Sequence, residues 1–177
     1  MRNHNLWLRN IESKQETQLS FDGCLGDSYQ KDAQRARSMG MQYDRKDAPP
    51  SLPDVTWSPD SRYLVALRTQ PVAQRTVYMV ESAPQDQLQP KLHSYPYLKP
   101  GDDIPVGRPQ LFSVEKQQYI PISDDLFSTP WSIGRIHWTA DASSFMFLYN
   151  QRGHQLMRVV SVTAATGVAR TVVDEPC

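Results

Sequence analysis

Two segments of the sequence repeat one pattern, and this repeat constrains the fold more than any other feature. Residues 55–67 read VTWSPDSRYLVAL, and residues 136–148 read IHWTADASSFMFL. In each segment a short apolar strand leads into a turn with an aspartate, whose carboxylate can accept backbone N–H bonds, and a second apolar strand follows. Both segments are therefore predicted to form strand–turn–strand units, with Trp57 and Trp138 at equivalent positions.

A second pattern occurs three times, as LWLRNIESKQETQLS, QLFSVEKQQYIPIS and MRVVSVTAATGVARTVV. Each copy is a short apolar strand, a polar turn and a second short strand, which is typical of a β-hairpin. We align the copies at Ile11, Val114 and Val162, directly before the turns. Joined to the tryptophan units, these hairpins give four-stranded antiparallel sheets, the blades of a β-propeller.

The sequence therefore predicts an all-β fold, a partial β-propeller of about two and a half four-stranded antiparallel blades with a long proline-rich insertion. The predicted parts of this single domain, residues 1–177, are an outer hairpin of one blade (1–22), an irregular linker (23–53), a blade (54–123) with its insertion (70–108), and a further blade (131–175).

The blade model makes predictions about burial. Trp57 and Trp138 should lie near the ends of inner strands in adjacent blades. The neighbouring side chains expected between the sheets are Leu64, Ala66, Phe145 and Phe147. The tryptophans expected in the core or between blades are Trp7, Trp57, Trp131 and Trp138.

The insertion and the linker are predicted to differ in structure from the blades. Residues 70–108 contain six prolines, and only Val77–Val80 is predicted as a strand there, with the remainder as an ordered loop. Within the linker, the segment QKDAQRARSMG favours a short helix, which the following APPSLP would end.

Composition limits the partners of the chain. Nineteen basic residues balance nineteen acidic ones, so no overall field attracts nucleic acid or an anionic membrane surface. No apolar run has the length of a signal peptide or a membrane span. With only Cys24 and Cys177, neither a disulfide framework nor a zinc site is expected, and we predict no cofactor.

The order of WSPDSRYLVALR, HSYPYLKPGD, QLFSVE and WTADASSFMFLYNQRGHQLMRVV resembles the N-terminal β-propeller of bacterial dipeptidyl peptidase IV-like enzymes, from Leu6 to Glu175. These enzymes belong to the prolyl oligopeptidase family of serine peptidases. The resemblance implies that the propeller caps an α/β-hydrolase domain, restricts access to its Ser-Asp-His triad and holds the substrate N-terminus. It also suggests a bacterial periplasm or cytoplasm, without choosing between them.

No G-x-S-x-G nucleophile motif occurs in the sequence, so we expect the chain by itself to have no peptidase activity. The expected partners are the peptidase domain of a parent serine dipeptidyl peptidase, its peptide substrate and, for the isolated fragment, other copies of itself. The alternative is a stand-alone propeller-type module for protein interaction. No catalytic, cofactor or metal residue is assigned.

Several side chains were weighed as sites. The family's paired glutamates, which bind the substrate amine, have no counterpart before WSPDS, so either the pair lies on another blade outside this sequence or the amine is held differently. The nearest acidic residues, Asp44 and Asp47, are interpreted as part of a solvated loop. A metal or acid–base site is weighed against a structural loop, which is favoured, for His93, Tyr95, Tyr97, Asp102 and Asp103. Arg152 and His154 are expected at an exposed hairpin tip that turns at Gly153.

Overall fold

The computed structural model describes residues 1–24, 26–29, 52–70, 72–73 and 75–177, which contain β-strands and one short 3-10 helix, η1 (Asp125–Phe127). The N-terminal hairpin pairs β1 (Trp7–Arg9) with β2 (Glu16–Gln18). The middle sheet contains β3 (Val55–Trp57), β4 (Tyr63–Thr69), β7 (Gly107–Ser113) and β8 (Gln118–Ile120). The C-terminal sheet contains β9 (Pro130–Trp138), β10 (Ser144–Gln151), β11 (Leu156–Thr163) and β12 (Ala169–Pro176). The projecting hairpin pairs β5 (Thr76–Glu81) with β6 (Lys91–Pro96).

The middle and C-terminal sheets are two copies of one unit. Both have four antiparallel strands in chain order, and their registers place Trp57 opposite Leu64 and Trp138 opposite Phe145. The turn between the first two strands contains a left-handed residue in each copy, Ser61 with φ 59° and Ala142 with φ 58°. The chain is thus an all-β, partial propeller, and the predicted fold class is confirmed.

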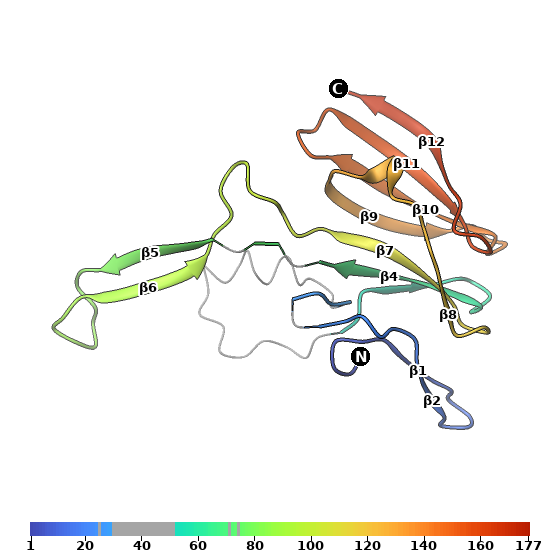
Figure 1. The fold of residues 1–177 in the computed structure, drawn as a ribbon, viewed down its shortest axis with the longest axis horizontal. Helices are drawn as coiled ribbons and strands as arrows, with labels where there is room; N and C mark the ends of the chain where they lie inside the picture. Colours follow the sequence, from blue (N-terminus) through green and yellow to red (C-terminus); the bar gives the residue numbers. More distant parts are fainter. Residues whose placement is uncertain (25, 30–51, 71, 74) are drawn as a thin grey trace.

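The main core lies between these two sheets, which face each other in Figure 1. Strands of alternating pattern supply it, because every second side chain points to the same face. The buried residues from the two sheets include Val65, Leu111, Phe145, Phe147, Val160 and Val162. Phe127 of η1 packs edge-on against Phe147, with ring centroids 5.1 Å apart.

The opposite face of the middle sheet packs against the N-terminal segment. Leu64 and Ala66 of β4 lie on this face, and the residues that cover them include Leu6, Leu19 and Tyr29. Together with the main core, this burial of Leu64, Ala66, Phe145 and Phe147 confirms the predicted interior of the blades.

The prediction that all four tryptophans are packing residues is wrong for three of them. Trp138 is buried, stacks on Tyr63 and donates a 3.3 Å hydrogen bond from Nε1 to the carbonyl of Thr56, so it joins the two sheets. Trp57, Trp7 and Trp131 are 43%, 36% and 46% exposed. Trp57 lies opposite Leu64 and shares the face that packs against the N-terminal segment, but that segment buries Leu64 and leaves Trp57 partly exposed.

Two local predictions also need correction. Ile11 lies in a turn and is 83% exposed. In the middle sheet Leu64 pairs with Phe112, and in the C-terminal sheet Phe145 pairs with Val162. Phe112, rather than Val114, is therefore the equivalent of Val162. The offset of two residues keeps the same face of the strand, so the apolar pattern could not reveal it.

The insertion contains more regular structure than predicted. Lys91–Pro96 forms β6 along the whole length of β5, although its sequence was interpreted as loop. The helix expected in the linker lies outside the described residues. Among the described residues, no helix is long and apolar enough to cross a membrane.

Candidate functional site

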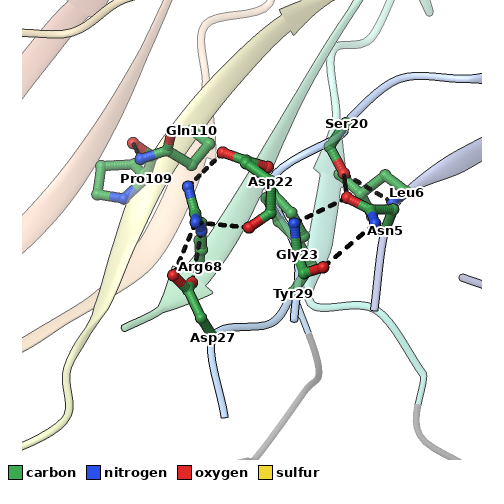
Figure 2. Close-up of polar contacts among 10 residues, drawn as sticks. All are labelled: Asn5, Leu6, Ser20, Asp22, Gly23, Asp27, Tyr29, Arg68, Pro109 and Gln110. Carbon is green, nitrogen blue, oxygen red and sulfur yellow. Dashed lines mark hydrogen bonds and ion pairs between the residues drawn. The ribbon is translucent and has the colours of Figure 1, made fainter. Parts of the chain in front are cut away.

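A polar cluster that joins distant parts of the chain centres on Arg68, near the end of β4 (Figure 2). Its guanidinium Nε donates a 2.6 Å hydrogen bond to Asp27, and it also forms an ion pair with Asp22. Asp22 in turn accepts a 3.0 Å hydrogen bond from the Tyr29 hydroxyl, and the guanidinium lies 5.9 Å from the centre of the Tyr29 ring. The cluster fixes the chain after β2 onto the middle sheet.

Electrostatics in this cluster follow from burial and charge. Burial favours the neutral form of Arg68, but the hydrogen bond that Arg68 donates to Asp27 and the charges of both aspartates outweigh it and raise the pKa of Arg68. Burial, followed by the neighbouring Asp22 carboxylate, raises the pKa of the Tyr29 phenol. Both raised pKa values keep Arg68 charged and the Tyr29 phenol protonated near neutral pH, so these contacts are suited to holding structure.

A second polar cluster lies beside the first and joins Asn5 to Ser20 and Gly23 (Figure 2). The side-chain oxygen of Asn5 accepts hydrogen bonds from the Gly23 amide at 2.8 Å and the Ser20 hydroxyl at 3.1 Å. A Cβ on Gly23 would lie 2.2 Å from the carbonyl oxygen of His4, so only glycine fits this close approach.

A cleft of about 410 Å³ opens at the rim between the middle and C-terminal sheets. We call it the rim cleft. It is lined by Gln70, Val72 and Ala73 after β4, by Asp103, Ile104, Val106 and Arg108 around the start of β7, by Ser128, Thr129 and Pro130 around the start of β9, and by Arg152 after β10. Six of the eleven lining residues are polar or charged, so the cleft is more polar than a usual ligand-binding site, and its volume is at the small end for such sites.

Two arginines carry the chemistry of the rim cleft. Arg108 donates to the carboxylate of Asp124 at 2.9 Å and to the carbonyl of Ser128 at 2.7 Å. Arg152 donates to the carbonyl of Asp102, and its guanidinium is 3.8 Å from the Asp103 carboxylate. These contacts pre-order both guanidinium groups, which have five N–H donors each and bind carboxylate or carbonyl oxygens well. The arrangement is suited to binding the carboxylate or carbonyl oxygens of a ligand.

The residues weighed from sequence as a metal or acid–base site have separate partners. His93 on β6 faces Glu81, with 2.8 Å between Nε2 and the carboxylate. Asp102 pairs with Arg75 at 2.7 Å, and a hydrogen bond from the Lys99 amide lowers the pKa of Asp102. Nowhere in the described ranges do three His, Cys, Asp or Glu side chains come close enough to hold a metal ion.

The remaining candidate residues are His154, Asp44 and Asp47. His154 contacts the Trp131 ring and Asn150 at the expected exposed turn, where Gly153 has φ 92°. Asp44 and Asp47 lie outside the described residues. Sequence reasoning missed the Arg68 cluster and Arg108, and it named Arg152 only as an exposed tip residue.

Comparison with known proteins gives one family and a consistent fold. The family model described as "Dipeptidyl peptidase IV (DPP IV) N-terminal region" matches residues 52–176. The structure is similar to that of Porphyromonas gingivalis dipeptidyl peptidase 4, with a TM-score of 0.71 and 18% identity over 99% of this chain and 24% of that chain. It is also similar to a putative dipeptidyl aminopeptidase IV from Bacteroides ovatus, with a TM-score of 0.60 and 14% identity over 100% of this chain and 25% of that chain.

At these identities the structural likeness shows the fold alone. The chain spans about a quarter of the length of both proteins. No curated protein matches the sequence.

Proposed function

Because the chain belongs to the family of dipeptidyl peptidase IV N-terminal regions, we propose that it is the non-catalytic propeller segment of a dipeptidyl peptidase IV-like serine exopeptidase. In this role it restricts access to the active site and positions the peptide, while a separate peptidase domain carries out hydrolysis. The observation that carries the proposal is the family match across both repeated blades, residues 52–176, together with their packing into one rigid core.

A first experiment tests whether hydrolysis requires another domain. Purified chain is incubated with a Gly-Pro chromogenic conjugate, and release of the chromophore is compared with buffer alone. We expect no rate above buffer. Turnover that a serine-directed inhibitor abolishes would contradict the proposal.

The rim cleft supports the positioning part of the role. Arg152 is 35% exposed in its side chain and pre-ordered by the Asp102 carbonyl, so it can donate to a peptide oxygen without losing much further freedom. In the intact enzyme, Arg152→Ala should raise KM for peptide substrates and leave kcat nearly unchanged. The matched control is Arg62→Ala at the opposite rim, which should leave both constants unchanged. Equal constants for R152A and the unmodified enzyme would exclude the cleft from positioning.

The alternative function, a stand-alone interaction module, predicts a protein of different length and activity in the cell. An antibody against this chain should isolate one long polypeptide with Gly-Pro peptidase activity if the proposal is correct. A polypeptide of the present length without that activity would favour the module.

We also propose that the isolated chain associates with itself through the outer face of the C-terminal sheet. By strand register, Met146, Leu148, Val159 and Val173 share this face, which we call the open face. The equivalent of Met146 in the middle sheet is Val65, which the C-terminal sheet buries completely. The open face therefore has the composition of a surface that another blade covers, and exposed apolar surface of this kind promotes association. Light scattering over a range of concentrations tests this proposal, and a monomer throughout would contradict it.

A further inference from the structure

The lining of the rim cleft has an excess of positive charge. Its charged residues are two cations, Arg108 and Arg152, and one anion, Asp103. The Asp103 carboxylate is 87% exposed and lies 3.8 Å from the Arg152 guanidinium, which is too long for a hydrogen bond. Water solvates Asp103 in this position, so its pairing with Arg152 is weak and a ligand can replace it.

Arg152 is the cation with the least compensation. It donates a hydrogen bond to the backbone carbonyl of Asp102, which carries no net charge. The Asp102 carboxylate has other partners, because it accepts a 2.9 Å hydrogen bond from the Lys99 amide and pairs with Arg75 at 2.7 Å. Within the described part of the chain, the Arg152 guanidinium is thus held in place by a neutral oxygen, and its charge is left for a ligand to complement.

Arg108 brings a second guanidinium to the cleft from the other blade. It pairs with Asp124 at 2.9 Å, but Asp124 is 59% exposed and is not among the residues that line the cleft. The exposed residues Ser128 and Thr129 add hydroxyl groups, which can donate hydrogen bonds, to the same lining. The cleft therefore gathers guanidinium and hydroxyl donors, while its one carboxylate faces water.

This set of donors selects the charge of the ligand. A guanidinium binds a carboxylate through two parallel N–H···O bonds, and such charge-assisted bonds are about twice as strong as neutral ones. An ammonium group in the same place would lie beside two cations and would be repelled. The apolar side chains of Val72, Ile104 and Val106 line the cleft beside the donors. They lower the local dielectric, which strengthens the attraction between a guanidinium and a carboxylate.

We propose that the rim cleft is a carboxylate-binding site, with Arg152 as its main binding residue and Arg108 as the second. The inference rests on the proposed function and specifies which chemical group of a peptide the cleft receives. A peptide has carboxylates in Asp or Glu side chains and at its C-terminus. A volume of about 410 Å³ suits one side chain or one end of a short peptide. Each blade contributes one arginine, so the site forms only where the two blades pack together.

Binding of matched peptides to this chain tests the inference without hydrolysis. The neutral reference is Gly-Pro-Gln-Gly with an amidated C-terminus. Replacing its Gln by Glu adds a side-chain carboxylate, and leaving the C-terminus free adds a terminal carboxylate. Each peptide is titrated into isotope-labelled chain and followed by NMR. The arginine Nε–H signals and the backbone amide signals of Asp103 and Thr129 report binding at the cleft.

We expect at least one carboxylate peptide to bind about tenfold more tightly than the neutral reference, because hydrogen bonds to charged groups contribute more than neutral ones. The peptide that shows this gain identifies the source of the carboxylate. Arg152→Ala should abolish the gain, and Arg152→Lys should retain part of it, because the charge remains without the planar fork. The matched control, Arg62→Ala at the opposite rim, should leave the gain unchanged.

Equal dissociation constants for the three peptides would overturn the carboxylate site, but a neutral peptide bound at the cleft would leave the proposed function intact. A gain that persists in a folded Arg152→Ala variant would also overturn the site, as would the absence of shifts at the cleft with every peptide. Carboxylate binding by a chain that proves to have no peptidase domain in the cell would contradict the proposed function and retain the site.

Discussion

Removal of the Arg68 side chain tests how the N-terminal segment is held to the blades. The side chain is 15% exposed and joins Asp27, 14% exposed, to Asp22, 52% exposed. In an Arg68→Ala variant, the mostly buried Asp27 carboxylate loses its cationic partner. The Asp22 carboxylate and the Tyr29 ring also lose their contacts with the guanidinium.

The expected cost follows from the unpaired charge. Breaking one partner of a buried ion pair costs about 3–5 kcal/mol. Asp22 is half exposed and can be solvated by water, so we expect a loss of about 2–3 kcal/mol in the free energy of unfolding. If the unpaired charge is the cause, Arg68→Met combined with Asp27→Leu should recover part of the loss, because no charge then remains buried.

Urea denaturation followed by circular dichroism measures the loss. The matched control is Arg62→Ala, which removes the same side chain from an exposed ion pair with Asp60. We expect no measurable change in that variant. An Arg68→Ala variant as stable as the Arg62→Ala variant would refute this reasoning, as would a double variant less stable than Arg68→Ala.

Three other outcomes are expected. Gly167→Ala should destabilise the chain more than Gly153→Ala in thermal denaturation, because both have positive φ but a Cβ at Gly167 would lie 2.0 Å from a backbone oxygen, whereas Gly153 has open space. Phe147→Ala should cost about 3–5 kcal/mol by the same measurement, since its ring is fully buried in the main core. The pKa of Asp60 is lowered to about 2, and the main cause is the hydrogen bond that Ser58 donates to it. The stability linked to this carboxylate is therefore fully present above its ordinary pKa and is lost as the pH falls through about 2. Ser58→Ala should therefore raise the pKa of Asp60 in an NMR titration, and an unchanged pKa would contradict the assignment.

The blade cores were predictable because their signal is local. Alternation in β4 and β10 assigns Leu64 and Phe145 to the interior without knowledge of what packs on them. The strand β6 was missed because Lys91–Pro96 is polar and contains proline, and its pairing with β5 decides its conformation.

The Arg68 cluster lacks such a local signal. Asp27 and Asp22 lie 41 and 46 residues from Arg68 in sequence, within a segment of no periodicity. One indication was available in the repeat, because the position of Arg68 corresponds to Tyr149, a core residue of the C-terminal sheet. An arginine at a core-facing position needs a carboxylate partner. The sequence could indicate this need, but only the tertiary structure identifies the partner.

The two blades are similar at one rim and differ at the opposite rim. At the rim with the short turns, Ser58 and Thr139 make the same pair of hydrogen bonds, to the backbones of Tyr63 and Ser144. The turn between the first two strands is thus held in the same way in both blades.

At the opposite rim, the connections between the second and third strands of the two blades differ. One connection carries the projecting hairpin, and the other is the tight turn at Gly153. The rim cleft lies between these connections, with Arg108 and Arg152 contributed by different blades. Loops on a rigid scaffold tolerate change without loss of the core, so selection for binding acts on them most easily. The differences between the two blades are found at the rim that carries both the cleft and the projecting hairpin, and this supports our proposal that the cleft positions the peptide.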